Sequence, residues 1–341
     1  MGITWYVARR LGWTLFAAWF AMTVTFVIIE ASPSADQLQA AVRAAQSAQG
    51  DPSEAVKDYK IAQGATGTPL ERYKDYMVGI LTLNWGWSTE RQQFALTAIA
   101  KAWPYSFQYA LPTVILTTIF GYGLGLLAAV NQGDTEDAFA TVVAFFGASI
   151  PNFWFAIMGI LVMGVWAQDA VLFGVSLKPI SLPVFYDSGI PKKYGFVSWQ
   201  NAKQLIMPVF VLATGGLGLQ MRYSRAQAIE NFQKEFVRTA RAKGHSDLGV
   251  MFKHVLRVAL VPLTNILVGT VLGVLVGSAV VIETIFQIPG LGLLFLQAAT
   301  QQDIPLILGP ALIFSAITIF GNLIEDLLYT VLDPRVDFDD R

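Results

Sequence analysis

Long apolar runs without a single charged residue constrain this chain more than any other feature. A helix needs ~20 apolar residues to cross the hydrocarbon core of a bilayer, and each run is about that long or longer. Only 14% of the residues are charged, against about 25% in soluble proteins. We therefore predict an all-α integral membrane protein with six transmembrane helices. The runs cover residues 11–29, 102–133, 138–168, 204–221, 258–282 and 304–324.

The first run admits two interpretations. Arg9 and Arg10 precede it, and the small residues at 30–32 resemble the cleavage site of a signal peptide. The run is long for a signal-peptide core, so we favour a retained first span within residues 1–30.

A polar segment, 31–103, follows the first run and is expected to lie outside the cytoplasm. Its part 34–66 has the composition of flexible surface. The part 68–89 carries apolar residues at helical spacing, which predicts an amphipathic helix at the outer interface rather than a seventh buried helix. Tyr73, Tyr76, Met77 and Ile80 form its apolar face, and Trp85 and Trp87 are candidate headgroup anchors.

The remaining chain, 104–332, is expected to form the core transmembrane domain. Prolines lie in or beside most of its apolar runs, and membrane helices tolerate such kinks. The stretch 284–302 is also uncharged, but it contains Pro289 and Gly290 and ends in glutamines. We predict a loop folded back into the outer mouth there, not a regular span.

A basic block at 222–257 sets the orientation. A Lys or Arg at the bilayer centre costs roughly 2.5–3.5 kcal/mol, so this block must remain in water, and short basic loops face the cytoplasm. Six spans then place both termini, including the tail 333–341, in the cytoplasm. The loop 131–137 has no basic residue and does not bear on orientation. The basic residues of the block are Arg222, Arg225, Lys234, Arg238, Arg241, Lys243, Lys253 and Arg257.

Gly244 divides the basic block into two helical pieces. Phe236, Val237 and Ala240 share one face before it, and Ser246 can cap a helix after it. The second apolar stripe would comprise Leu248, Met251, Phe252, Val255 and Leu256. Such a pair of helices suits docking on a cytoplasmic partner, and an ordinary basic loop lying on anionic lipid is the alternative.

Glycines four residues apart predict close helix packing. Gly121 and Gly125 show this spacing, as do Gly269, Gly273 and Gly277. Packing within the chain is the first expectation, and packing against a second membrane-spanning chain is the alternative.

Several kinds of chemistry are absent from the sequence. It contains no cysteine, no phosphate-binding loop and no metal-ligand cluster, and its formal net charge of −1 predicts no nucleic-acid partner. The carboxylates Glu283, Glu325 and Asp326 fall at the ends of apolar runs, where solvation is expected, whereas ion coupling would need charge at mid-membrane. We expect no catalytic residue, no metal and no cofactor in this chain.

Several stretches, in one order along the chain, resemble ABC-importer permeases of the dipeptide/oligopeptide/nickel family, B-type subunit. The strongest is EFVRTARAKGHSDLGVMFKHVLRVALVP. Others are YVARRLGWTLF, TPLERYKDYMVGILTLNWGWST, SIPNFWFAIMGI, GSAVVIETIFQIPGLG and NLIEDLLYTVLDPRV. The stretch 34–66 lacks the resemblance.

The resemblance implies the six-helix fold of a type I ABC-importer permease, with an extracytoplasmic segment after the first helix. Expected partners are a second permease, two cytoplasmic ATPases that use ATP and Mg, an extracytoplasmic solute-binding protein and membrane lipid. By position, ATPase coupling would fall to Arg238, Thr239, Ala240, Ala242, Lys243, Gly244, His254, Leu256 and Arg257. Arg238, Thr239 and Ala240 stand where other importers have Glu-Ala-Ala, and Arg257 stands where they have proline.

Two further expectations follow from the same resemblance. Glu283, Pro289 and Gly290 form a candidate outer gate, with a structural cap as the alternative role of Glu283. The expected substrate is a di- or oligopeptide; nickel chelates, glutathione and small glycans are alternatives. A self-sufficient secondary transporter or channel is the rival from another class, and it would need a mid-membrane charge or an internal repeat.

Overall fold

A computed structural model describes residues 3–31, 68–88, 90–172, 175–178, 181–277, 279–301 and 303–332. The polar stretch 34–66, the last residue of the possible cleavage site and the tail 333–341 lie outside these ranges. The structure forms two compact units. One comprises Met1–Leu11, Ala102–Leu293 and Ile317–Arg341, and the other comprises Gly12–Lys101 and Leu294–Ala316.

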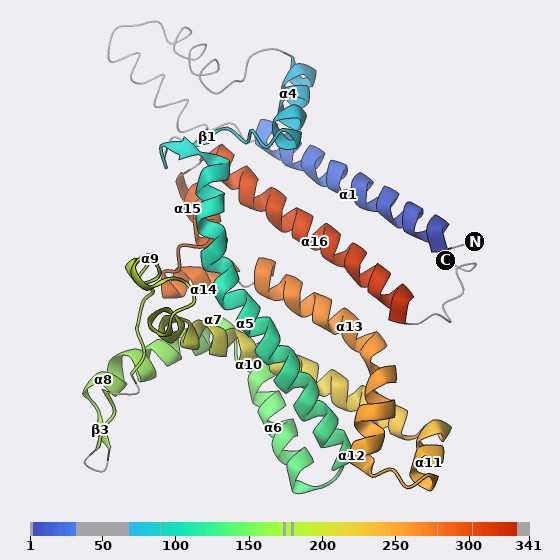
Figure 1. The fold of residues 1–341 in the computed structure, drawn as a ribbon. Coiled ribbons are helices and arrows are strands. Elements are labelled where there is room, and N and C mark those ends of the chain that lie inside the picture. Colours follow the sequence, from blue (N-terminus) through green and yellow to red (C-terminus); the bar gives the residue numbers. More distant parts are fainter. Residues whose placement is uncertain are drawn as a thin grey trace, which may run out of the picture. The chain divides into compact units, whose positions relative to one another are not determined.

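The described chain contains four continuous helices that are long and apolar enough to cross a membrane, or up to seven spans if each of three bent helix pairs counts as one. Four of the predicted runs fall on the continuous helices, which extend beyond the runs in most cases. These helices are α1 (Ile3–Ala31), α5 (Ala95–Val130), α10 (Trp199–Phe232) and α16 (Ile304–Leu332) (Figure 1).

The predicted run 138–168 is not one continuous helix. It comprises α6 (Thr135–Ser149), α7 (Asn152–Gly159), the π-helix η1 (Ile160–Trp166) and α8 (Ala167–Asp169). The path bends by 97° between α6 and α7. Proline disfavours a helical conformation in the residue before it, and Ile150, which precedes Pro151, is extended at φ −87°, ψ 122°.

The next predicted run is also interrupted. It falls on α13 (Leu256–Leu272), the π-helix η4 (Gly273–Gly277) and α14 (Ala279–Phe286). After α14 the chain turns by 90° into α15 (Leu291–Gln301). The expectation that 284–302 is not a regular span is confirmed, and the turn includes Gln287 at φ 56°.

In the second unit, α4 (Pro69–Leu81) packs on α1 through the face predicted from its sequence. A capping box between Thr68 and Glu71 begins the helix. The Tyr73 hydroxyl lies 2.8 Å from the Thr23 hydroxyl, and the Tyr73 and Tyr76 rings contact Phe26. The predicted amphipathic helix is therefore present, with its apolar face against α1.

A short hairpin follows α4, formed by β1 (Trp87–Ser88) and β2 (Gln93–Phe94). The Ser88 hydroxyl donates a 2.6 Å hydrogen bond to buried Asp303, which precedes α16. Trp85 packs beside Gly309 of α16, whereas the Trp87 ring is 47% exposed. Of the two tryptophans, Trp87 keeps the exposure that a headgroup anchor requires.

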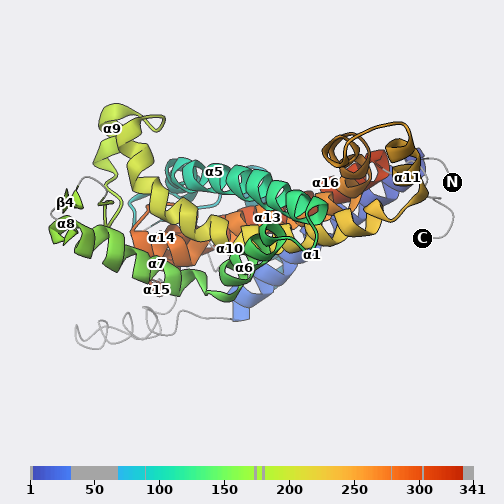
Figure 2. The same cartoon turned by 90° about the horizontal axis from the view of Figure 1, so that it is seen from below.

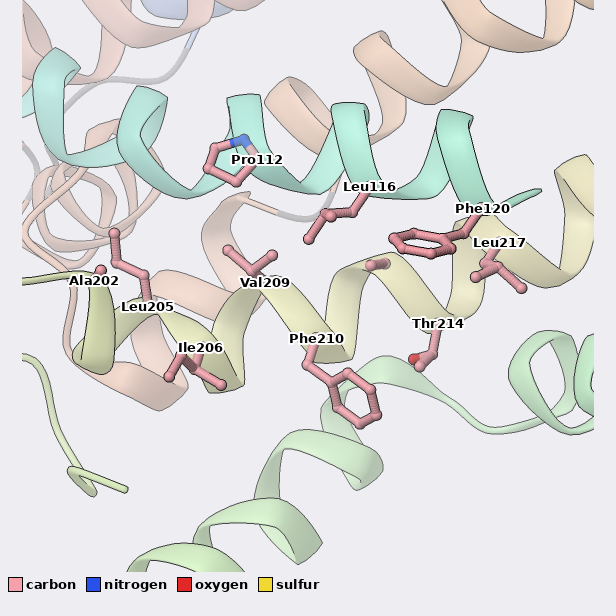
Figure 3. Close-up of a pocket in the computed structure, with 11 residues that line it drawn as sticks. Pro112, Leu116, Phe120, Ala202, Leu205, Ile206, Val209, Phe210, Thr214 and Leu217 are labelled. Carbon is pink, nitrogen blue, oxygen red and sulfur yellow. The ribbon is translucent and has the colours of Figure 1, made fainter. Parts of the chain in front are cut away.

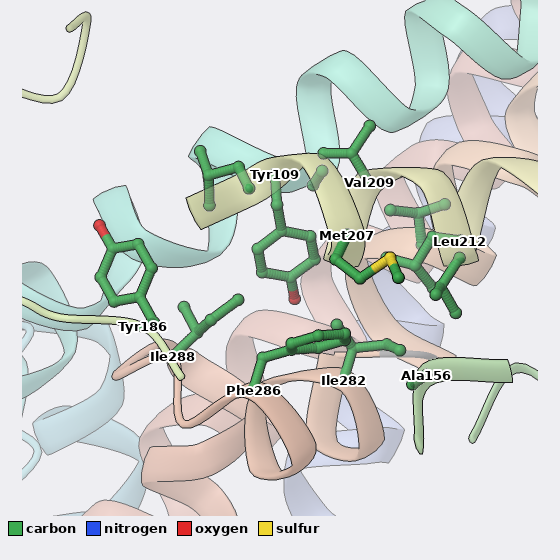
Figure 4. Close-up of a cluster of buried hydrophobic side chains, with 13 residues drawn as sticks. Tyr109, Ala156, Tyr186, Met207, Val209, Leu212, Ile282, Phe286 and Ile288 are labelled. Carbon is green, nitrogen blue, oxygen red and sulfur yellow. The ribbon is translucent and has the colours of Figure 1, made fainter. Parts of the chain in front are cut away.

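The core of the first unit lies where α5, α7, α10 and α14 meet (Figure 4). Tyr109, Met207, Ile282 and Phe286 are among its buried members. The chain between α8 and α10 also contains the hairpin β3 (Val171–Leu172) and β4 (Val175–Ser176) and the short helix α9 (Gly189–Tyr194) (Figure 2).

The two sets of spaced glycines behave differently. A Cβ on Gly125 would meet the backbone oxygen of Met221 at 2.4 Å, and one on Gly121 would meet Gln220 at 2.8 Å. The expected packing within the chain is thus confirmed for α5 against α10. By contrast, a Cβ on Gly269 or Gly273 would have no atom of the described chain within 4 Å.

Candidate functional site

The centre of the basic block is a compact elbow, residues 235–257. It contains α11 (Glu235–Ala242), α12 (Asp247–Val250) and the π-helix η3 (Met251–Val255). Gly244 has φ 84°, a conformation that glycine adopts without steric cost. The His245 N–H bonds the Ala240 carbonyl and the Gly244 N–H bonds the Arg241 carbonyl, which is a Schellman motif.

The next helix begins almost immediately. The Ser246 hydroxyl accepts a hydrogen bond from the Gly249 N–H, so the predicted N-cap is confirmed. Gly244 and Ser246 together end one helix and begin the next, with only residues 243–246 between α11 and α12. The elbow therefore has a defined bend instead of a long flexible loop.

A buried apolar cluster joins the elbow to the ends of α5 and α10. Val237, Ala240, Val250, Met251 and Val255 pack against side chains of both helices. Ala240 is buried in this cluster and Leu256 packs against it, so these two predicted coupling residues build the interior of the elbow. The other members of the cluster are Leu126, Ala129 and Ala228.

Five predicted coupling residues form the exposed surface of the elbow: Arg238, Thr239, Ala242, Lys243 and Arg257. Arg238 forms a 2.8 Å ion pair with Glu235, and both side chains remain largely exposed. His254 is half-buried, with its ring centroid 5.6 Å from that of His245. The backbone bend at Gly244 is likewise open to solvent.

The predicted second apolar stripe is partly wrong. Met251 and Val255 are buried, whereas Leu248 and Phe252 are 49% and 60% exposed, so the predicted residues do not share one face. The cause is the π-helical segment η3: its wider turn places Val250 and Val255, five residues apart, in the same core. Leu248 and Phe252, four residues apart, are left as an apolar pair on the surface.

Arg225 has a role that the sequence did not reveal. Its guanidinium forms two hydrogen bonds with Asp137 at the start of α6, Nε to Oδ1 at 2.6 Å and Nη2 to Oδ2 at 2.7 Å. Asp137 lies in the loop 131–137, which carried no orientation signal. The pair spans 88 positions in the chain, and no local pattern indicates it.

At the other candidate site, Glu283 is fully buried. Its carboxylate accepts hydrogen bonds from Ser106 Oγ (2.6 Å), the Tyr109 hydroxyl (2.9 Å) and the Leu293 N–H (2.8 Å). Ser106 also accepts from the Leu291 N–H at 2.8 Å. These contacts satisfy free N–H groups in the first turn of α15, which is what a helix cap does.

Gly290 is required beside this carboxylate, because a Cβ there would lie 2.2 Å from Glu283 Oε1. Pro289 belongs to the same turn between α14 and α15. The geometry is that of the structural-cap alternative for Glu283, and a gating role stays a prediction.

Comparisons with known proteins agree with this architecture. Residues 121–338 match the family described as the inner membrane component of binding-protein-dependent transport systems. The oligopeptide transport system permease protein AppB of Bacillus subtilis (strain 168) is 34% identical over 69% of this chain and 70% of its own length. DppB, the dipeptide transport system permease protein of the same organism, is 31% identical over 75% and 76%.

The chain belongs to this family. It is a multi-pass inner-membrane transport component, a permease subunit of a binding-protein-dependent importer. Its relatives are named as transport permeases and not as enzymes.

The permease has an apolar groove between α5 and α10. One part has a volume of about 460 Å³ and is lined by residues that include Leu116, Phe120, Val209 and Phe210 (Figure 3). A second part of about 700 Å³ shares Pro112 with the first and adds Gln108 and Ser198 among its lining residues. All the lining residues in both parts are uncharged.

Proposed function

We propose that this permease forms half of the translocation path of an ATP-driven importer of di- and oligopeptides. A second, homologous permease completes the path. Two cytoplasmic ATPases, which use ATP and Mg, supply the free energy, and a solute-binding protein delivers the substrate outside. The permease itself contributes no catalytic residue and no cofactor.

The main support for this proposal is the structure of the elbow. A partner that moves the permease needs a firm contact surface, and the elbow is held by a buried core and a fixed bend. On its surface, Leu248 and Phe252 form an apolar pair beside exposed basic side chains. An apolar helix face flanked by charge suits a groove on a partner better than it suits lipid headgroups alone.

A contact near the chain ends supports the topology. Arg10 of α1 and Asp326 of α16 form a 2.9 Å ion pair within one unit, so the two ends lie at the same membrane depth. This pairing supports the proposed even number of spans, in which both termini are cytoplasmic and the α14–α15 turn is re-entrant. Asp326 thus has a partner, where the sequence suggested simple solvation.

The peptide substrate is proposed from the relatives, whose names specify oligopeptide and dipeptide transport. The uncharged groove beside α5 and α10 suits a substrate class with variable side chains, since a charged wall would select among them. Nickel chelates, glutathione and small glycans are the alternative substrates of the same machinery.

The docking proposal is tested by Leu248→Ala/Phe252→Ala in the complete complex. Both side chains are exposed, so the variant keeps the elbow core. We expect ATPase co-purification to fall by about thirtyfold, because truncating an anchor at the centre of an interface costs about 2 kcal/mol or more. Val197→Ala, an exposed apolar residue in the loop before α10, is the matched control. Undiminished co-purification would remove the elbow from the docking surface.

A second pair of variants probes the bend and its charge. Gly244→Val forces a β-branched side chain into a positive-φ position, and Arg238→Glu reverses an exposed charge. Each should reduce ATPase co-purification and uptake of trialanine into proteoliposomes. Uptake by the permease alone, without ATPases or nucleotide, would instead establish the secondary transporter or channel.

The substrate is tested with the binding protein and the reconstituted complex. Trialanine, a nickel–histidine chelate, glutathione and a disaccharide are offered separately at equal concentration. Saturable, ATP-dependent uptake of trialanine supports the proposal, and uptake of only one of the others reassigns the substrate.

A further inference from the structure

The loop between α5 and α6 is fastened to α10 by one acidic side chain. Asp137 binds the Arg225 guanidinium through both carboxylate oxygens, and its Oδ2 also accepts the Gly133 N–H at 3.0 Å. Gly133 lies at the loop tip with φ 92°. The carboxylate therefore holds both the loop and the neighbouring helix.

The pair is better protected than a surface ion pair. The Asp137 side chain is 8% exposed and that of Arg225 is 30% exposed. Bidentate, charge-assisted hydrogen bonds are the stronger and more directional kind. Exposed pairs with free rotamers contribute little, whereas here both Asp137 carboxylate oxygens are bound by the Arg225 guanidinium.

The same two helices are also in backbone contact further along. A Cβ on Gly218 of α10 would lie 2.4 Å from the Ala144 carbonyl oxygen, and one on Gly147 of α6 would lie 2.5 Å from that of Thr214. The ion pair and these two close approaches follow one another along α6 and α10. Packing of this density moves as a unit.

The pair also lies next to the elbow. Ala228, one turn beyond Arg225 on α10, belongs to the buried cluster that holds α11 and η3, as do Leu126 and Ala129 near the end of α5. A displacement of the elbow therefore acts first on the ends of α5 and α10, beside the Asp137–Arg225 contact.

From this arrangement we infer that Asp137 and Arg225 are positioning residues for transport. Their ion pair stays closed through the cycle and makes α6 follow α10 when the ATPases move the elbow. The inference rests on the proposed function, because it assigns how the docking force reaches the spans. Arg225 thereby acts within the permease and not on the ATPase surface.

The first test removes the charge of one partner at a time. In proteoliposomes containing both permeases, the ATPases and the binding protein, Asp137→Asn and Arg225→Gln should each lower trialanine taken up per ATP hydrolysed by about fivefold. ATPase co-purification should remain at the wild-type level, which distinguishes this failure from loss of docking. Asp134→Asn is the matched control, since Asp134 precedes the same helix and its side chain makes no capping hydrogen bond.

The second test exploits the absence of cysteine from the natural chain. Asp137→Cys/Arg225→Cys should show the same low uptake per ATP, and joining the two thiols with a short bismaleimide should restore it to at least half of the wild-type value. Inhibition by the crosslink would show that the helices must separate, which overturns the inference. Unchanged uptake per ATP in Asp137→Asn would overturn it as well.

Discussion

The helices on the two sides of the elbow are built differently. On one side α5, α6 and α10 meet at glycines that bring backbones into contact, and Asp137 and Arg225 link two of them. On the other side α13 continues into the π-helix η4, contains Pro262, and leaves Gly269 and Gly273 without a neighbour among the described residues. The chain bends by 66° between 247–260 and 262–276. The elbow thus joins a tightly packed block to a segment with interrupted hydrogen bonding.

This difference in packing indicates which helices of the permease can change shape. A π-helical turn or a proline weakens the regular ladder of helix hydrogen bonds, so bending there disturbs few contacts. In the α5–α6–α10 block, a relative shift would either drive backbone atoms into one another or break close packing. We therefore expect the block to move rigidly and α13–η4 to change shape.

The largest loss of stability is expected when a methyl group is added at a glycine inside the α5–α6–α10 block. Gly218→Ala places a Cβ against the Ala144 carbonyl and should lower the free energy of unfolding by about 3 kcal/mol. Gly269→Ala, with open space around it, should change that free energy by less than about 1 kcal/mol. Unfolding in mixed detergent micelles measures both free-energy changes. Equal losses in the two variants would show that the α5–α6–α10 block is not packed more tightly than α13.

A smaller loss of stability is expected from Glu283, which lies in α14 at the end of the segment α13–η4–α14. Glu283→Gln replaces one acceptor oxygen by an amide donor that faces hydroxyl and N–H donors, so we expect a loss of about 2 kcal/mol in unfolding free energy. Glu230→Gln is the control: its side chain is 63% exposed in a pair with Lys234. A wild-type stability for Glu283→Gln would show that the buried network does not hold α14 to α15.

The smallest expected effect is on transport, and it comes from Pro262→Ala. Replacing the proline with alanine restores an N–H donor and favours a straighter α13. We expect trialanine uptake per ATP to fall by about threefold while stability is maintained. Faster uptake in Pro262→Ala would indicate that the bend is not needed for the cycle.

Sequence patterns predicted a feature correctly where residues close together in the chain determine it. The bend between Gly244 and the Ser246 N-cap depends on residues a few positions apart, and it was predicted at the right place. The apolar face of α4 followed from helical spacing alone. The family, likewise, was indicated by several motifs in one order along the chain.

The features that sequence patterns missed also have identifiable physical causes. Leu248 and Phe252 were placed on one stripe with Met251 and Val255, but a π-helical turn changes the spacing of the buried face and leaves them exposed. The predicted run 138–168 is divided by the turn before Pro151, which hydropathy does not register. Asp137 and Arg225 are far apart in the chain, so only the folded structure brings the pair together.

Distance measurements between spin labels test the central claim most directly. Labels at Phe139 on α6, Tyr223 on α10 and Asn265 on α13, all exposed, would be compared in nucleotide-free and vanadate-trapped complexes. We predict an unchanged 139–223 distance and a shifted 223–265 distance. A shifted 139–223 distance with a constant 223–265 distance would contradict the rigid block and the account built on it.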